Sequence, residues 1–386
     1  MWVGAMWGGN DRRQVDPASE ALHLTPSPIP QEARPDHGDP DYLALERAQN
    51  DANARPGPRY VPARSIPIPT SASGLLQEMI AAPYALPKWT ASHPQRPEDW
   101  KRPVDLLTAS TLSTMADTRR KLAVRLDEKV VGGVRVFELT PENIRRENEH
   151  RILVHLHGGG FVYFPGEAGT MEATLMAAYA GYRVLSVDYR LAPDFPYPAA
   201  LDDAMSVYRA LVQEKDPRRI AVFGTSAGGN LTLALMLRAK AEGLALPGAI
   251  GPGTPWSDLT RAGGGDTMET LEWIDGNLVS YNGYISHSAI AYASGNDMAD
   301  PLISPLRGDF RGLPPAILTS GTRDLFLSLT CLTHRKLRQA DVVAELHVYE
   351  AMAHGQYLNP WPPSRRRCIR RSDPSLIGIL HDSHQA

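Results

Sequence analysis

Five short apolar runs recur from residue 152 onward, and each is followed by a loop and a stretch with helical periodicity. The runs are Ile152 to Leu156, Val184 to Val187, Ile220 to Phe223, Ala316 to Thr319 and Leu346 to Tyr349. Runs of this length are typical of strands buried on both faces, and their alternation with helices predicts an α/β fold: a mostly parallel central sheet with helices on both faces. Ligands of such sheets bind beyond the carboxyl ends of the strands, so the residues after each run are the first candidates for chemistry.

The chain divides into four parts by composition and pattern. Residues 1–40 are rich in Pro, Asp, Gly and Ser without a periodic apolar pattern, and we expect them to be disordered. Residues 41–120 carry short helical stretches broken by prolines, as expected of a helical cap. Residues 121–359 hold the sheet domain, and residues 360–386 form an atypical basic tail. The helical stretches are Asp41 to Ala52, Ser73 to Ala82 and Val104 to Arg120.

An antiparallel hairpin is predicted at the start of the sheet domain. Leu122 to Leu126 and Val134 to Leu139 alternate apolar and polar residues, and Gly132-Gly133 stands between them as a turn signal.

Composition excludes several classes of function. The chain has 386 residues and a net charge of −3, which gives no field for nucleic acid or an anionic membrane. No stretch reaches the roughly 18 apolar residues of a membrane span. Two cysteines, Cys331 and Cys368, form no disulfide framework and no metal-ligand spacing. The apolar N-terminus lacks a signal-peptide pattern, so a cytoplasmic location is expected.

Gly224-Thr225-Ser226-Ala227-Gly228 lies between the run that ends at Phe223 and a helical stretch from Leu231 to Ala241. This G-x-S-x-G pattern in a strand–turn–helix context is typical of a nucleophile elbow, in which serine occupies a strained turn and the glycines allow close approach of backbones. A chance match in a glycine-rich loop is the alternative. The context favours the elbow, with Ser226 as the nucleophile.

His157-Gly158-Gly159-Gly160-Phe161 follows another predicted strand. Three glycines there leave backbone N–H groups free to bind a developing oxyanion, as acyl transfer requires. A flexible glycine turn without a catalytic role is the alternative. A phosphate-binding loop is excluded because neither G-x-x-x-x-G-K-[ST] nor G-x-G-x-x-G is present.

A serine nucleophile needs a base and an acid that orients it, and in this arrangement they follow in the order Ser, acid, His. His354 opens a loop after the last predicted strand and is the predicted base. Asp324 follows the run that begins at Ala316 and is the predicted acid. Asp300, which precedes a proline, is the alternative, although a carboxylate there would ordinarily cap a turn. The other downstream histidines are His287, His334, His347, His381 and His384.

Three motifs together resemble bacterial hormone-sensitive-lipase-like (family IV) carboxylesterases of the α/β-hydrolase superfamily. They are His157-Gly158-Gly159-Gly160, Asp188-Tyr189-Arg190-Leu191-Ala192-Pro193 and Gly224-Thr225-Ser226-Ala227-Gly228-Gly229-Asn230, and the resemblance covers about Leu122 to Asn359. Thr225 makes the elbow motif resemble the branch of the family that carries G-T-S-A-G. Thr322-Arg323-Asp324-Leu325 resembles that branch too, and this resemblance places the acid at Asp324. Asp194 departs from the family's usual Glu.

The resemblance implies a serine esterase that hydrolyses short- to medium-chain acyl esters through an acyl-enzyme intermediate. It implies oxyanion donors at the backbone N–H groups of Gly159, Gly160 and Ala227, a helical N-terminal cap, no metal and no cofactor. Because many members are dimers, a homodimer is expected. A lactone hydrolase or amidase with the same triad is an alternative. A small-molecule receptor on this scaffold, as in the plant gibberellin receptors, is another, but those have lost the base whereas His354 is present.

The tail departs from the family, which closes with an amphipathic helix. Pro360-Trp361-Pro362-Pro363 is followed by Arg365 to Arg371, which contains five arginines. A solvated basic tail, a nucleic-acid arm and a shifted reading frame are three interpretations, and the second has no support elsewhere in the chain. Under the third, the tail forms no packed helix.

Overall fold

The computed structural model describes residues 40–358 except 62, 64, 83 and 85–93. These residues fall in two compact units divided between Ala81 and Ala82. The smaller unit holds helices α1 (Pro40–Ala52) and α2 (Gly74–Ala81), within two residues of the predicted positions. The predicted disorder of residues 1–39 and the tail from residue 360 onward lie outside the described residues.

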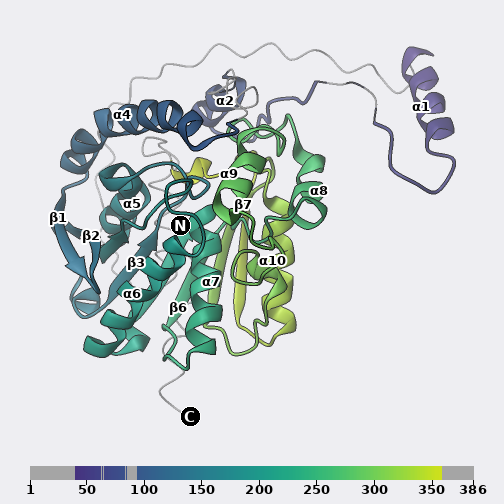
Figure 1. The fold of residues 1–386 in the computed structure, drawn as a ribbon. Coiled ribbons are helices and arrows are strands. Elements are labelled where there is room, and N and C mark those ends of the chain that lie inside the picture. The colour runs from purple at the N-terminus through teal and green to yellow at the C-terminus, as the bar shows by residue number, and fades with distance from the viewer. Residues whose placement is uncertain (1–39, 62, 64, 83, 85–93, 359–386) are drawn as a thin grey trace. The chain divides into compact units, whose positions relative to one another are not determined.

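The larger unit is built on an eight-stranded sheet, counted over the described residues (Figure 1). The strand order is β1-β2-β4-β3-β5-β6-β7-β8. β1 pairs with β2 and β2 with β4 in antiparallel fashion, and the pairs from β4 to β8 are parallel. The strands are β1 (Val124–Val131), β2 (Val134–Pro141), β3 (Ile152–Leu156), β4 (Arg183–Val187), β5 (Ile220–Thr225), β6 (Ala249–Gly253), β7 (Ala316–Gly321) and β8 (Ala344–Tyr349).

The hairpin of β1 and β2 closes where the sequence predicts it. Gly132 and Gly133 both have positive φ, +58° and +80°, and Val131 pairs with Val134. Two successive residues of positive φ make the tight turn whose twist matches that of the flanking strands. The first strand extends five residues beyond its predicted end at Leu126.

Side chains of the parallel strands alternate between two apolar clusters, one on each face of the sheet. Val222 and Leu318 belong to one cluster, and Phe223 and Ile317 belong to the other. Helices α6 (Ala199–Glu214), α7 (Ala227–Ala241) and α10 (Leu327–Gln339) contribute to the first, and α5 (Met171–Ala180) contributes to the second. Helices on both faces of a mostly parallel sheet confirm the predicted α/β class.

Helix α4 (Pro97–Lys121) begins seven residues before the predicted start at Val104. Pro97 stands in the first turn, and the Asp99 carboxylate accepts the Arg96 N–H at 3.0 Å at the start of the helix. These N-terminal signals outweigh Pro103, which lies inside the helix although the prediction took prolines as breaks. Trp100 of this helix is buried, and its ring packs edge-on against Tyr163 with centroids 5.9 Å apart.

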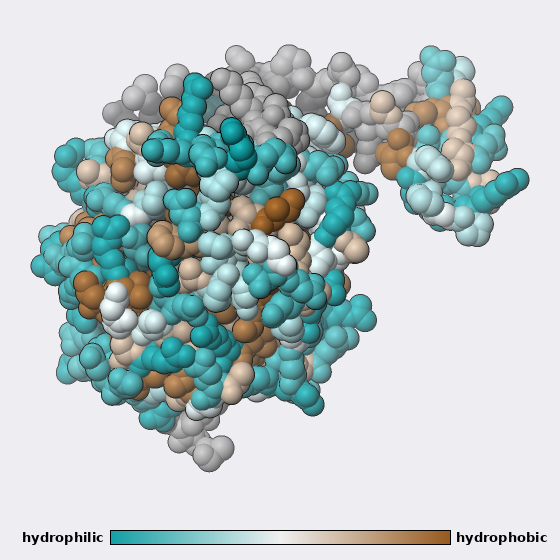
Figure 2. Space-filling view, in the orientation of Figure 1, coloured by the Kyte–Doolittle hydropathy of each residue, from teal (hydrophilic) through white to brown (hydrophobic). Residues whose placement is uncertain are grey.

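Strand β6 and helices α8 (Asp266–Met268) and α9 (Tyr284–Ala293) complete the larger unit. Its surface is mostly hydrophilic on the face that Figure 2 shows, with apolar side chains in small separate groups. No helix in the described part of the chain is long and apolar enough to cross a membrane.

Candidate active site

Ser226 occupies the turn between β5 and α7 in a backbone conformation that side chains seldom adopt, with φ of +63° and ψ of −119°. Such a conformation persists only where the surroundings impose it. The Ser226 N–H donates to the Gly253 carbonyl at 3.0 Å, and the Ser226 carbonyl accepts from the Trp256 N–H at 3.1 Å. Ser226 is largely buried, with 9% of the residue exposed, and it lies at the carboxyl edge of the sheet.

Gly224 and Gly228 bring the elbow against the neighbouring strand. A Cβ added at either glycine would overlap the carbonyl oxygen of Leu156, the last residue of β3. Only residues without a side chain permit this approach, which explains both glycines of the motif. The contact also joins the elbow to the glycine-rich loop, because His157 directly follows Leu156.

The glycine-rich loop runs beside the nucleophile. A Cβ added at Gly158 would lie 3.5 Å from the Ser226 Cβ, and Gly159 and Gly160 have φ of +112° and +63°. The N–H groups of Gly159, Gly160 and Ala227 make no hydrogen bond to any described residue. Three free donors next to the serine are what an oxyanion hole requires.

His157, the first residue of this loop, is held by Tyr189. Its ring stacks on Tyr189 with centroids 4.2 Å apart, and its carbonyl accepts from the Tyr189 hydroxyl at 2.6 Å. Burial lowers the pKa of His157 to about 4, so the ring is neutral at physiological pH.

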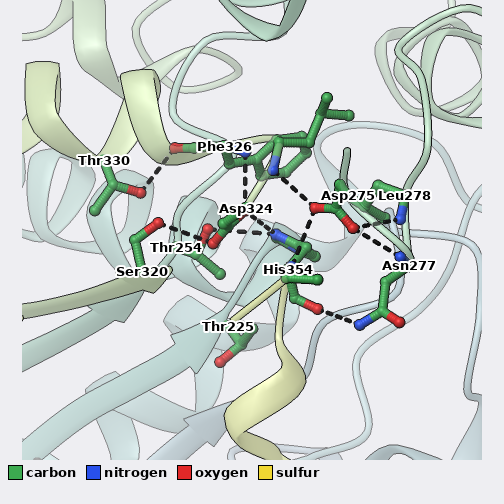
Figure 3. A network of polar contacts seen from close by, with 12 residues as sticks. Thr225, Thr254, Asp275, Asn277, Leu278, Ser320, Asp324, Phe326, Thr330 and His354 are labelled. Atoms are coloured by element: carbon green, nitrogen blue, oxygen red, sulfur yellow. Dashed lines mark hydrogen bonds and ion pairs between the residues drawn. The ribbon is translucent and has the colours of Figure 1, made fainter. Parts of the chain in front are cut away.

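His354 and Asp324 are in contact at the same edge of the sheet. His354 Nδ1 donates to Asp324 Oδ1 at 2.9 Å (Figure 3). Asp324 is fully buried, and its carboxylate also accepts from the Phe326 N–H and the Ser320 hydroxyl, both at 2.9 Å. Three donors hold the carboxylate in one orientation toward the imidazole.

The imidazole of His354 has one nitrogen engaged and one available. Nδ1 lies 3.3 Å from Thr254 Oγ1 in addition to Asp324, and the ring packs edge-on against Phe326 at 4.5 Å. Nε2 has no hydrogen-bond partner among the described residues, and neither has the Ser226 hydroxyl. The structure therefore joins base and acid directly and leaves the serine–base contact unmade. Catalytic hydrogen bonds often tighten only in the substrate complex.

The alternative acid and the described histidines downstream of Ser226 other than His354 have structural partners. Asp300 accepts from the Leu302 N–H at 2.8 Å and so caps its own turn. His287 contacts the Gly283 carbonyl, His334 the Ala344 carbonyl, and His347 stacks on Tyr349. His381 and His384 lie outside the described residues.

A buried carboxylate that the sequence did not single out lies beneath the elbow. Glu172 Oε1 accepts from the Thr225 hydroxyl at 2.7 Å, and Oε2 accepts from the Thr225 N–H at 3.2 Å and from His155 Nε2 at 3.1 Å. The Tyr357 hydroxyl lies 2.8 Å from Thr225 Oγ1. This network, Glu172 with His155, Thr225 and Tyr357, links the elbow to the segment that follows His354.

Asp275 is a second carboxylate that the sequence did not single out, and it lies against the backbone of His354. It accepts from the backbone N–H of His354 at 3.1 Å, and Asn277 donates to the His354 carbonyl at 2.6 Å. Asp275-Gly276-Asn277 carries turn signals in the sequence, but nothing local indicates a partner 79 residues away.

A family model described as alpha/beta hydrolase fold matches residues 153–358, which is more than half of the chain. The chain belongs to the α/β-hydrolase family. An esterase of Acinetobacter venetianus is 32% identical over 61% of this chain and 78% of the relative. The crystal structure of esterase E25 superposes with a TM-score of 0.78 at 38% identity, covering 83% of this chain and 98% of that chain. An esterase from the bacterial hormone-sensitive lipase family gives a TM-score of 0.67 at 27% identity, covering 81% and 99%.

These relatives confirm the family that the three motifs indicated, together with the α/β-hydrolase fold and an ester hydrolase as the class of enzyme. Within the described residues of this α/β hydrolase, no group of three or more His, Cys, Asp or Glu side chains could hold a metal ion.

Proposed function

We propose that this α/β hydrolase is a serine esterase that cleaves short- to medium-chain carboxylic esters through an acyl-enzyme intermediate. Ser226 is the nucleophile, His354 the general base and Asp324 the acid that orients it. The observation that carries the proposal is the 2.9 Å contact between Asp324 and His354, at the same sheet edge as Ser226 with its strained backbone.

The contact determines which nitrogen of the base can act. Asp324 engages Nδ1, so the proton of neutral His354 resides there and Nε2 carries the lone pair. Nε2 takes the Ser226 proton as Oγ attacks the ester carbonyl. The imidazolium then protonates the leaving alcohol, and the buried Asp324 carboxylate stabilises that charged form.

The negative charge of the tetrahedral intermediate needs fixed donors. We assign this role to the backbone N–H groups of Gly159, Gly160 and Ala227. Donors with no other partner cost no reorganisation when the charge develops, and removal of one such donor in a serine protease lowers kcat by about 10²–10³-fold. Water then attacks the acyl-enzyme with His354 again as base, and Ser226 is regenerated.

We infer that α4 belongs to the cap predicted for residues 41–120 and covers the substrate. Its Trp100 packs on Tyr163, which follows the proposed oxyanion loop by three residues, and Tyr163 in turn packs edge-on against Tyr284 of α9 at 5.8 Å. Apolar contacts of this kind suit an acyl group. A homodimer and a cytoplasmic location stay predictions from the sequence.

Turnover of 4-nitrophenyl esters from acetate to decanoate, beside a lactone and an anilide, tests the proposal. We expect hydrolysis of the short and medium esters, and less than about 10⁻³ of that rate for Ser226→Ala. Faster cleavage of the lactone or the anilide would replace the substrate class. Absence of turnover by correctly folded protein would favour a receptor.

A further inference from the structure

Asp275 is a fully buried carboxylate outside the proposed triad. Its Oδ1 accepts from the N–H groups of Asn277 at 2.7 Å and Leu278 at 3.0 Å, which closes its own turn. Its Oδ2 accepts from two distant residues, Leu325 at 2.7 Å and His354 at 3.1 Å. Leu325 adjoins the proposed acid and His354 is the proposed base, so one oxygen atom binds both loops of the acid–base pair.

Asn277 completes the arrangement. Its Nδ2 donates to the His354 carbonyl at 2.6 Å, so a single turn holds both the N–H and the C=O of the base (Figure 3). Asp324, in contrast, contacts only the ring of His354. The backbone of the base and its ring are therefore fixed by two different carboxylates.

Turn closure alone does not explain a buried charge at residue 275. Asp300 closes a turn with one oxygen and remains near the surface, where a carboxylate is solvated. The pKa of Asp275 is raised on balance, because burial and the nearby Asp324 outweigh His354 and the N–H donors, which lower it. All four partners are donors, which suits the ionised carboxylate. A buried Asp275 carboxylate close to Asp324 costs electrostatic free energy. Its contacts with the loops of the acid–base pair offset that cost.

We propose that Asp275 and Asn277 form a clamp that positions His354, with Asp275 also stabilising the imidazolium of the reaction. The clamp residues are positioning residues, since they act through the base and touch no substrate. The inference rests on the proposed function, in which His354 is the base. Removal of the clamp leaves the triad present but its base misaligned, which slows chemistry more than substrate binding.

The titratable groups that face the Asp275–His354 pair are few. Asp324 adjoins both, Tyr284 of α9 interacts with Asp275, and Tyr357 interacts with Asp324. Burial raises the pKa of both tyrosines, so they stay neutral across the working range. The acidic limb of kcat/KM then reports His354 with two carboxylates beside it. Neutralising one of these carboxylates disfavours the charged imidazolium, so the acidic limb moves to lower pH.

Asp275→Asn and Asn277→Ala test the clamp, with 4-nitrophenyl butyrate as substrate and active sites counted by an organophosphate titration. For Asp275→Asn we expect kcat per active site to fall about 10- to 100-fold, KM to change less than about threefold, and the acidic limb to move down by about half a pH unit or more. For Asn277→Ala, which loses one hydrogen bond to the base, we expect a kcat several-fold below wild type.

Asp258→Asn is the matched control. Asp258 is also a buried carboxylate that closes its own turn, through the Thr260 N–H at 2.9 Å, and it contacts neither Asp324 nor His354. It should keep the wild-type kcat per active site and the wild-type acidic limb, even where its melting temperature falls.

Wild-type kcat per active site and an unmoved limb for Asp275→Asn would overturn the inference, and so would equal losses in Asp258→Asn. If Asp275→Asn does not fold, an unchanged kcat in Asn277→Ala overturns it. Failure of the proposed function has a different signature: Ser226→Ala or His354→Ala would retain turnover, whatever the clamp variants do.

Discussion

Ser226 and its flanking glycines make the residue-scale argument most clearly. The serine adopts φ of +63°, and the elbow tolerates this because Gly224 and Gly228 allow it to press against the end of β3. The sequence predicts the arrangement because both glycines and the serine lie within five residues. Local spacing suffices where the partners are local.

Substitution of aspartate by asparagine distinguishes the proposed acid, Asp324, from the alternative acid, Asp300. We expect Asp324→Asn to lower kcat by about 10⁴-fold, because an amide at this position can leave His354 in the wrong tautomer, as in the serine-protease example. Asp300→Asn should keep at least a tenth of wild-type kcat, since Asp300 only caps its turn. Steady-state kinetics of both variants, with circular dichroism for folding, decide the matter. A severe loss in folded Asp300→Asn with a mild one in Asp324→Asn would exchange the two assignments.

Other residues around the site were not predictable from the sequence. Ser226, Asp324 and His354 each follow a strand, so the rule about strand ends finds them. Asp275 and Glu172 do not directly follow a predicted strand, and their partners His354 and Thr225 lie 79 and 53 residues away. A single sequence contains no record of those pairings, which arise only when the sheet brings the loops together.

Strand β6 shows the same limit at the scale of the element. Ala249-Ile250-Gly251-Pro252-Gly253 contains two glycines and a proline, which read as a turn, yet it is a buried central strand between β5 and β7. Its pairing is supplied by its two neighbours rather than by its own propensity. A Cβ at Gly253 would lie 2.5 Å from the Tyr357 hydroxyl, so a side chain at residue 253 would displace that hydroxyl from the network beneath the elbow.

That network should contribute to the stability of the β5–α7 junction. Thr225→Val removes the hydroxyl that donates to Glu172 and contacts Tyr357, and leaves both partners buried without it. We expect the free energy of unfolding to fall by about 1–3 kcal/mol. Thr232→Val, whose hydroxyl donates to the Gly228 carbonyl within α7, is the control and should cost about 1 kcal/mol or less. Urea denaturation measures both, and equal losses would show that the network adds nothing.

For the molecule as a whole, strand order explains why residues 157, 226, 324 and 354 lie along one edge of the sheet. β3, β5, β6, β7 and β8 are parallel neighbours, so their carboxyl ends share one edge. The alternation of strands and helices predicts this edge, whereas the strand order comes from the structure. The tail from residue 360 lies outside the described residues, and sequencing of the gene tests the shifted-frame interpretation.

Stability of the whole molecule should depend on pH through His157. Its pKa is lowered from 6.5 to about 4, so as the pH falls the unfolded chain binds a proton before the folded one does. Stability is therefore lost between about pH 6.5 and about pH 4, by about 3 kcal/mol from this residue. In His157→Phe, which can keep the stack on Tyr189, denaturation between pH 7 and pH 4 should show a shallower loss. Parallel curves for the two proteins would contradict the assignment.

The most direct measurement of the central claim is the site of covalent attack. Diethyl 4-nitrophenyl phosphate reacts with an activated serine, whose Oγ bonds to phosphorus as 4-nitrophenolate leaves. Peptide mass spectrometry should locate one diethylphosphoryl group per chain on Ser226, formed in proportion to the loss of ester turnover, and none in Ser226→Ala. A label on another residue that tracks the lost activity, or full inactivation of the enzyme without a label on Ser226, would contradict the account.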